Sequence, residues 1–291
     1  MMLKTTPHHA RRMNNRAACC LSNTSLSNTS LRNTIASLLV SVLVLLHTPF
    51  ALANDYRNFP DPDGPQDEFH MARLVFQPNA YSQWHPPGRP WWRIDWPEAE
   101  QHFIGGLQRY TRLNVAADSA HLQLNDDAIF DYPWLFAQQV GRWQLSFNEA
   151  RRLGEYLNRG GFLVVDDFHG PEQWQVFKDV MDVALPDHDI IALDDSDALM
   201  QIHYELDGLI QIPGRRHIVG WSADKAIVDM PFSPQRWLGI YDNEGRLSVA
   251  INFNMDMGDA WEHADDPYYP QAMTSLAYRF GINYIIYALT H

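Results

Sequence analysis

The middle of the chain alternates strand and helix patterns, and this alternation constrains the fold more than any other feature. Two apolar runs, Trp134–Val140 and Phe162–Val165, predict buried strands, and the second is continuous, as in a strand covered on both faces. Between them, Ser146 and Glu149 have the spacing of a capping box at the start of a helix. A second helix of about fifteen residues is predicted after Pro171. Strand, helix, strand and helix with short connections predict a parallel, doubly wound sheet.

The flanking segments complete one predicted α/β domain over residues 71–291. The pattern predicts a strand at Arg73–Phe76, a helix at Glu98–Tyr110, a hairpin of Trp237–Tyr241 with Leu247–Phe253, and a long apolar helix at Pro270–Leu289. We also expect Gly105 and Gly106, inside the first of these helices, to allow a close contact between helix and strand. The predicted fold class is a three-layer, doubly wound, mostly parallel sheet with a C-terminal hairpin and a long buried helix.

The first residues have the pattern of an export signal. Basic residues precede the apolar run Ile35–Leu46, and Ala51-Leu52-Ala53 supplies a cleavage site for removal of residues 1–53. That run is too short to span the ~30 Å hydrocarbon core of a membrane. Residues 54–70, rich in Asp, Pro and Asn, predict a flexible leader. We therefore expect a periplasmic or secreted protein with no stable membrane insertion after signal removal.

Charge and cysteine usage exclude several classes of function. The chain has 22 basic and 35 acidic residues, and cleavage would remove five of the basic ones, leaving 17 against 35 and a net charge of −18. Nucleic acid and anionic lipid repel such a chain, so we expect neither as a partner. Cys19 and Cys20 would leave with the signal, which excludes disulfides, thiolate metal sites and a cysteine nucleophile from the mature protein.

Acidic and imidazole side chains follow two of the predicted strands. Asp166, Asp167 and His169 follow the strand that ends at Val165. The set at the end of the strand Leu247–Phe253 comprises Asn252, Asn254, Asp256, Asp259, Glu262, His263, Asp265 and Asp266. Because the carboxyl ends of parallel strands open into a crevice, we expect the two sets to line a ligand site if their strands are neighbours.

Three interpretations of these side chains remain open. Oxygen and imidazole ligands without sulfur suit Zn²⁺, Mn²⁺, Mg²⁺ or Ca²⁺, with Asp167, His169, Asp259 and His263 as the candidate metal ligands. Alternatively, the acids cap helices and pair with Arg142 or Arg279, with Asp265 and Asp266 capping the last helix. A carboxylate beside a histidine could also serve as a metal-free general base.

Aromatic residues crowd the segment Tyr81–Trp96. Trp84, His85, Trp91 and Trp92 all lie in this Pro-rich stretch. Their rings could bind a sugar by stacking, with Trp84, Trp91 and Trp92 as the platform. They could equally hold the loop against the core, which is the commoner role of such rings.

Three motifs resemble a known bacterial family. GGFLVVDDFHG at 160–170, FNMDMGDAWEHADDPYYP at 253–270 and YRFGINY at 278–284 are similar to the domain of unknown function numbered 4159, DUF4159, and the resemblance extends from about Arg73 to the C-terminus. It implies a flavodoxin-like sandwich grouped with class I glutamine amidotransferases. Their thiol is not carried over, because Asp166-Asp167-Phe168 occupies the position of the nucleophile. Larger members occur beside MoxR-type ATPases and von Willebrand A-domain proteins, which implies envelope assemblies as partners.

Two functions from different classes follow as expectations. The first is a non-catalytic ligand-binding or assembly module of the cell envelope with a crevice lined by acids and histidines. The alternative is a metal-dependent hydrolase acting on an envelope polymer. The chain contains no G-x-S-x-G, so a serine nucleophile of that kind is not indicated for either function.

Overall fold

The computed structural model describes residues 68–82, 90–206, 208, 210–222, 225–228 and 236–291. The predicted signal peptide and most of the predicted leader lie outside the described residues, as do Trp84 and His85. The long C-terminal helix is among the described elements. No helix in the described ranges is both long and apolar enough to cross a membrane.

In the described part of the chain, seven strands form one sheet in the order β2-β1-β3-β4-β9-β8-β5. The parallel strands are β1 (Ala72–Val75), β2 (Ala120–Gln123), β3 (Trp134–Gln138), β4 (Phe162–Phe168) and β9 (Leu247–Phe253). The antiparallel edge consists of β8 (Arg236–Tyr241), paired with β9, and β5 (Ile190–Ala192), paired with β8. The predictions of a mostly parallel sheet and of a hairpin before the last helix are confirmed.

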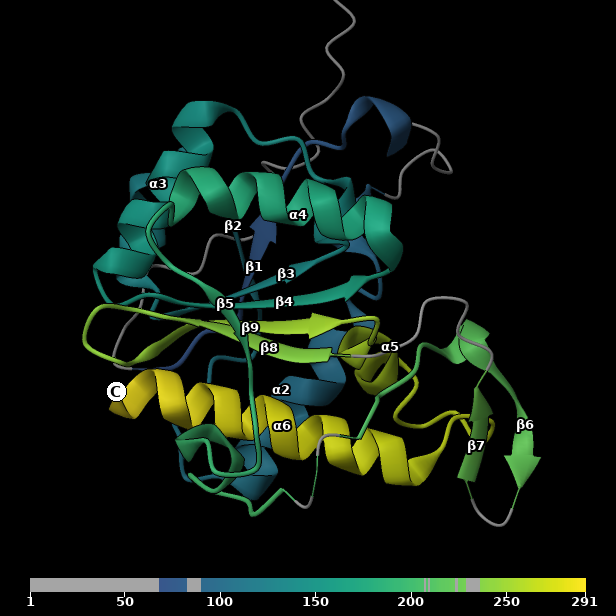
Figure 1. Ribbon diagram of the computed structural model, residues 1–291. Helices are drawn as coiled ribbons and strands as arrows, with labels where there is room; N and C mark the ends of the chain where they lie inside the picture. Colours follow the sequence, from purple (N-terminus) through teal and green to yellow (C-terminus); the bar gives the residue numbers. More distant parts are fainter. Residues whose placement is uncertain (1–67, 83–89, 207, 209, 223–224, 229–235) are drawn as a thin grey trace, which may run out of the picture. The chain divides into compact units, whose positions relative to one another are not determined.

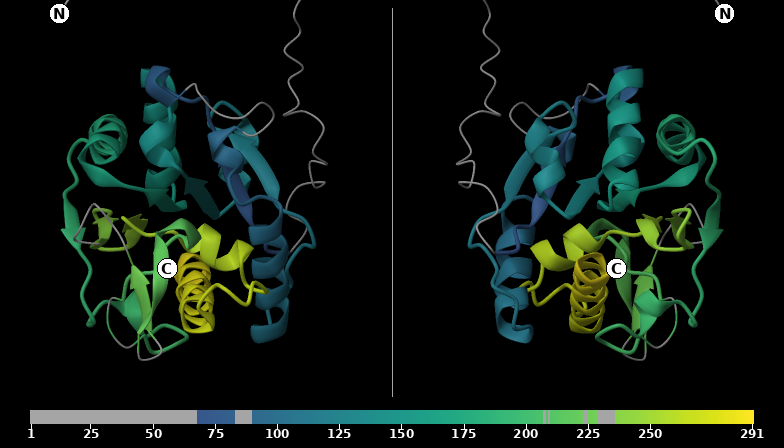
Figure 2. Two further views of the ribbon diagram at one scale, coloured as in Figure 1. Left: turned by 90° about the vertical axis from the view of Figure 1, so that its right-hand side faces the viewer. Right: turned by 90° about the vertical axis from the view of Figure 1, so that its left-hand side faces the viewer.

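Helices cover both faces of this sheet (Figure 1). One face carries α3 (Phe147–Asn158) and α4 (Gly170–Ala184), and the other carries α2 (Glu98–Tyr110) and α6 (Gln271–Thr290). Figure 2 shows α2 and α6 side by side beneath the sheet. The short helix α5 (Met257–Glu262) follows β9, and a separate antiparallel pair joins β6 (Ile218–Ser222) to β7 (Lys225–Val228). The sheet is therefore the middle of three layers.

Local signals explain why several elements begin where they do. The capping box is confirmed, because Ser146 Oγ accepts the Glu149 amide at 3.2 Å and Glu149 Oε2 accepts the Ser146 amide at 2.8 Å. The predicted bounds of α2 are also correct. The last helix packs against the sheet, as expected, and Trp237 of β8 stacks on Phe280 of α6 at a ring separation of 3.9 Å.

Three predictions were wrong, two at the ends of strands and one inside a helix. β4 continues to Phe168, so Asp166 and Asp167 lie inside the strand and not in a turn after it. The segment after β9 contains α5 where a loop was predicted. Gly106 faces another helix and not a strand, because a Cβ added there would overlap the ring of Tyr278 in α6. The first two changes bring the acidic side chains closer to the sheet than the sequence indicated.

Candidate functional site

The two acidic sets lie at the same edge of the sheet. β4 and β9 are neighbours and pair in parallel, with Val165 opposite Ile251 and Phe168 opposite Phe253. Their carboxyl ends therefore lie side by side, and Asn252 Nδ2 donates to Asp166 Oδ1 at 3.2 Å across the pair. The strand pairing thus brings together the two segments that the sequence placed at strand ends.

Asp166 anchors the short helix that carries most of the other acids. Its Oδ2 accepts the backbone amides of Met257 at 2.7 Å and Gly258 at 3.0 Å, at the N-terminal end of α5. Asn252, which donates to the other oxygen, accepts a hydrogen bond from Tyr284 at 2.7 Å. Burial raises the pKa of Asp166 to about 6, against the effect of these hydrogen bonds. All three donors to the Asp166 carboxylate come from β9 and α5, so Asp166 positions α5.

Three further carboxylates converge beside α5. One oxygen each from Asp95, Asp256 and Asp259 lies within 4.8 Å of the others, and Asp259, Glu262 and His263 form a second grouping of the same kind. Asp256 is buried and caps α5, its Oδ1 accepting the Asp259 amide at 2.9 Å. Asp259 belongs to both groupings, so they form one continuous candidate site. We call these five residues the acidic cluster.

Two glycines make room for the acidic cluster. A Cβ on Gly214 would lie 2.7 Å from Asp256 Oδ2 and 3.1 Å from Asp259 Oδ2. A Cβ on Gly258 would overlap the Gln138 amide and crowd Asp95. Because any side chain at these positions would push the carboxylates apart, the backbone itself forms part of the site wall.

The acids of the cluster repel one another in a buried setting. Burial raises the pKa of Asp95 well above its ordinary value, and the charges of Asp259 and Asp167 raise it further. Burial likewise raises the pKa of Asp256, with Asp167 and Asp259 adding to the effect. No lysine or arginine side chain of the described chain lies within 4.0 Å of the Asp95, Asp256 or Asp259 carboxylate. A bound cation would supply the missing positive charge.

Asp95 reaches the cluster because a buried arginine holds its loop. Arg73 in β1 donates to the carbonyls of Trp92 and Ile94, both at 2.9 Å, and to Gln138 Oε1 at 2.7 Å. Gln138 in turn donates to Asp95, and Arg73 also pairs with the buried Glu100 of α2. The side chain of one strand residue thus ties the loop, β3 and α2 together.

Basic and imidazole groups lie on the other side of Asp167. Its Oδ1 is 3.5 Å from Arg216 Nη2 and 3.6 Å from His169 Nε2, while Gln139 donates to its Oδ2. Arg142 Nε donates to Gln139 Oε1 at 2.7 Å. Burial raises the pKa of Asp167 to about 8, although Arg216 opposes the rise. Asp167 therefore contacts Arg216 and His169 directly and Arg142 through Gln139, and we call Arg142, His169 and Arg216 the basic side of Asp167.

His169 is neutral and has no hydrogen-bond partner at either ring nitrogen among the described residues. Its side chain is buried, and its ring centroid lies 5.1 Å from that of His217. Burial lowers the pKa of His169 to about 3, with Arg216, His217 and Arg142 adding to the effect. A buried neutral imidazole in this position is able to accept a hydrogen bond from a ligand.

The remaining predicted residues have separate roles. Asn254 accepts the Gly170 amide at 3.0 Å and so orders the start of α4. Asp265 is exposed, and Asp266 accepts the Tyr268 amide at 2.8 Å and pairs with Arg215 at 3.3 Å. Neither acid caps α6, whose N-cap is Pro270, so that capping prediction was wrong. Asp167 and His169 belong to neither metal-compatible grouping found in the described ranges.

The aromatic segment is partly a core element. Trp92 is only 1 % exposed, so its faces are not open to a sugar, and the predicted stacking platform is incomplete. Trp91 lies under the guanidinium of Arg142 at 3.9 Å and donates to the Ser82 carbonyl at 2.6 Å. These contacts support the interpretation of a loop held by its rings.

Sequence reasoning missed Asp95, Gln138 and Arg73. Asp95 was hidden among aromatic residues, although a lone acid before a predicted helix is a usable signal. Gln138 ends an otherwise apolar strand, and Arg73 interrupts another. A polar residue inside a buried strand indicates either a partner across the fold or a site, and here it indicates both.

Comparisons with known proteins bear on the family and leave the activity open. A family model described as "Domain of unknown function (DUF4159)" matches residues 76–289. A search of curated proteins finds no match to the chain. The matched range contains all five residues of the acidic cluster and the basic side of Asp167.

Proposed function

Because the chain belongs to the DUF4159 family, whose description gives no activity, we propose its function from the geometry of the site. The protein is a divalent-cation-dependent module that binds an anionic ligand at the carboxyl edge of its sheet. The observation that carries this proposal is the convergence of three carboxylates, one buried (Asp256) and two partly buried (Asp95 and Asp259), with no lysine or arginine partner in the described chain.

The two groupings favour different ions. Asp95, Asp256 and Asp259 offer only oxygen, which suits Ca²⁺, Mg²⁺ or Mn²⁺. Asp259, Glu262 and His263 add an imidazole, which suits Zn²⁺ or Mn²⁺. Since Asp259 is common to both, one ion at this residue could draw ligands from either grouping.

The basic side of Asp167 supports an anionic ligand. A bound divalent ion would offer an anion an open coordination position, while Arg142, His169 and Arg216 supply donors beside Asp167. A phosphate or carboxylate group that contacts both the ion and these donors would be held from two elements of the site. This arrangement suits a binding module of the kind expected from the sequence.

Cation titration of chelator-treated protein tests the proposal. We expect at least one of Ca²⁺, Mg²⁺, Mn²⁺ and Zn²⁺ to raise the Tm by roughly 5–10 °C at a hundredfold excess over Kd. Asp256→Asn should abolish that response, whereas Asp265→Asn, an exposed acid of the same segment, should keep it. Inorganic phosphate should then bind only when the cation is present.

The variants also distinguish the two groupings. Loss of the Zn²⁺ response alone in His263→Ala would assign the imidazole-containing grouping to zinc, and an unchanged Ca²⁺ response would leave the oxygen grouping in place. The cation proposal would be abandoned if no ion stabilised the wild-type protein more than it stabilises Asp256→Asn.

A second candidate is the metal-dependent hydrolase of an envelope polymer. The buried His169, with both ring nitrogens lacking a hydrogen-bond partner in the described residues, favours it because such an imidazole can accept a hydrogen bond from a water molecule and so orient it for attack. Bis-p-nitrophenyl phosphate with Mn²⁺ is a suitable probe. Turnover that His169→Gln removes while cation binding persists would support hydrolysis, and a complete lack of turnover on ester and amide probes would leave the binding module.

The finer fold type and the location belong to the same proposal. The five parallel strands have the spatial order β2-β1-β3-β4-β9, which corresponds to the flavodoxin-like order and so supports a flavodoxin-like or glutamine amidotransferase-like assignment.

Export to the periplasm or medium, with envelope proteins of the MoxR and von Willebrand type as partners, is supported by the pattern of residues 35–53 and the family resemblance. N-terminal sequencing of the mature protein would contradict export if it began at Met1.

A further inference from the structure

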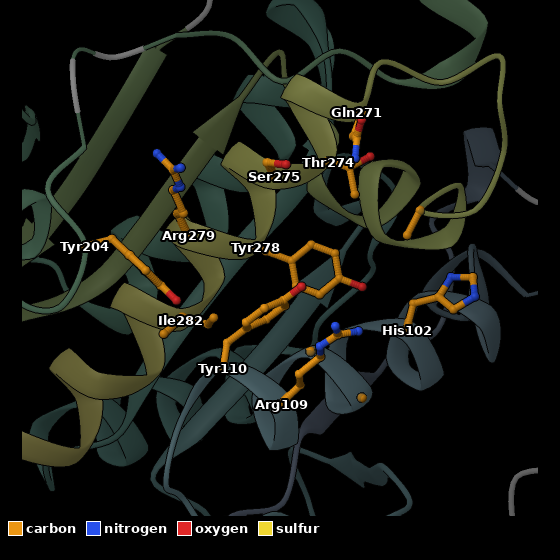
Figure 3. Close-up of a pocket in the computed structure, with 13 residues that line it drawn as sticks. His102, Arg109, Tyr110, Tyr204, Gln271, Thr274, Ser275, Tyr278, Arg279 and Ile282 are labelled. Carbon is orange, nitrogen blue, oxygen red and sulfur yellow. The ribbon is translucent and has the colours of Figure 1, made fainter.

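A pocket of about 550 Å³ lies between α2 and α6, on the face of the sheet that these two helices cover, and Figure 3 shows it in close-up. One side of α2 lines it with residues three, four, seven and eight positions apart: His102, Gly105, Gly106, Arg109 and Tyr110. α6 contributes Gln271, Thr274, Ser275, Tyr278 and Arg279 in the same spacing, and Tyr204 closes one side. The pocket is thus built from two packed helices and not from a surface loop.

Two arginines of the pocket lack acidic partners. In the described part of the chain no carboxylate oxygen lies within 4.0 Å of Arg109 or Arg279. By contrast, six other arginines of the described residues have a carboxylate oxygen within 4.0 Å: Arg73, Arg152, Arg159, Arg215, Arg216 and Arg246. Each guanidinium instead lies over a tyrosine ring, Arg109 at 5.7 Å from Tyr110 and Arg279 at 6.0 Å from Tyr204. Their donors therefore remain open to an anion.

The adjacent glycines Gly105 and Gly106 shape the pocket in different ways. A Cβ on Gly106 would overlap Tyr278, so this glycine is explained by the packing of α2 on α6. A Cβ on Gly105 would have no atom within 4 Å. A glycine inside a helix lowers helix stability relative to alanine, and packing within the protein gives no reason for it here. Gly105 lines the pocket, so the space it leaves is space for a ligand.

We propose that this pocket binds a small anionic ligand that carries a flat ring. The guanidinium of Arg109 takes the phosphate or carboxylate and Arg279 adds positive charge from α6, while the ring packs against tyrosine and the open face of Gly105. The site is separate from the acidic cluster and needs no cation.

Isothermal titration with phenyl phosphate, in the presence of EDTA, tests this site apart from the cation site. We expect Arg109→Gln and Arg279→Gln each to weaken binding at least about tenfold. Arg112→Gln is the matched control, because Arg112 is likewise an exposed arginine without a described carboxylate partner but lies outside the pocket. Phenol carries only the ring of phenyl phosphate and inorganic phosphate carries only its anionic group, so each should bind more weakly than phenyl phosphate. Benzoate tests whether a carboxylate can replace the phosphate.

Gly105→Ala should change stability and ligand binding in opposite directions, which a purely structural role of Gly105 would not produce. We expect it to raise the Tm, since alanine favours the helix, and at the same time to weaken phenyl phosphate binding at least about threefold because its methyl group occupies the pocket. Three results would each overturn the proposal. The first is equal phenyl phosphate binding by Gly105→Ala and wild type, and the second is a loss of binding in Arg112→Gln equal to that in the two pocket variants. The third is the absence of heat on titration with phenyl phosphate at about 10 mM.

Discussion

Left-handed backbone marks the site residue by residue. Among the described residues other than glycine, Asp95, Gln139, Asp167 and Asn254 have positive φ angles, between 52° and 63°. Gln139, Asp167 and Asn254 all lie at the carboxyl end of a strand, and Asp95 lies in the loop that meets them. Aspartate and asparagine tolerate this region better than most residues, whereas glutamine does so at a cost. We infer that the contacts of the site hold these four residues in conformations they would not adopt alone.

Asp167→Asn should stabilise the cation-free protein at neutral and alkaline pH. The folded-state pKa of about 8 lies above the ordinary value of 3.8, so the favourable effect of this carboxyl on folding is complete below pH 3.8 and is lost as the pH rises through 8. One unit of such a shift corresponds to about 1.4 kcal/mol, and we expect a gain of at least that size at pH 8. Urea denaturation with EDTA at pH 5 and pH 8 measures it.

The exposed Asp265 supplies the control for that measurement. Asp265→Asn removes the same charge without removing a buried carboxylate, so the free energy of unfolding should change little at either pH. If Asp167→Asn lost stability between pH 5 and pH 8 as steeply as the wild type, another group would be responsible for the loss.

At the scale of elements, Arg73 joins β1 to three neighbours. Its contacts reach the loop before α2, the end of β3 and Glu100 of α2, and both Arg73 and Glu100 are almost fully buried. A buried pair of this kind contributes little net stability but strongly opposes the removal of one partner. The contacts therefore matter more for where the loop lies than for how stable the domain is.

A double-mutant cycle separates these two roles. Arg73→Met should cost about 3–5 kcal/mol in the free energy of unfolding, because it leaves the Glu100 carboxylate buried without its partner. Adding Glu100→Gln should restore part of that stability. The double variant should still bind the cation more weakly than wild type, because the loop of Asp95 has lost its anchor. Wild-type affinity in a stable double variant would show that Arg73 does not position Asp95.

For the whole molecule, local patterns predicted the layers and long-range contacts completed the site. Periodicity and capping are local, which is why α2, α3 and the β8–β9 hairpin were predicted with small errors at their ends. The pairing of β4 with β9 then brought Asp166 near Asp256, as strand ends in a parallel sheet allow. Asp95 could not be predicted in this way. The position of Asp95 depends on Gln138 and Arg73, which are remote in sequence. No local sequence pattern therefore links these two residues to Asp95.

The pKa shifts of the buried histidines and acids have opposite signs, and they predict an unusual dependence of the molecule's folding stability on pH. Burial lowers the pKa values of His121 and His169 to about 3, so their contribution to stability is present above pH 6.5 and is lost as the pH falls toward 3. Burial raises the pKa values of Asp166 and Asp167 to about 6 and 8, so their contribution is present below pH 3.8 and is lost as the pH rises through 6 and 8. The two effects oppose each other between pH 3.8 and 6.5.

We therefore expect the cation-free protein to lose stability as the pH rises from 6.5 to 8, where most proteins do not. A bound divalent cation stabilises the ionised carboxylates of its site and does not remove the burial that lowers the pKa values of His121 and His169. It should therefore raise the stability above pH 6.5 while the loss below pH 4 remains. Thermal melts from pH 3.5 to 8.5, with EDTA and with the cation that stabilises the protein most, measure the loss of stability at both low and high pH. If the cation raised the Tm equally at all pH values, its site would not be the raised-pKa carboxylates of this edge of the sheet.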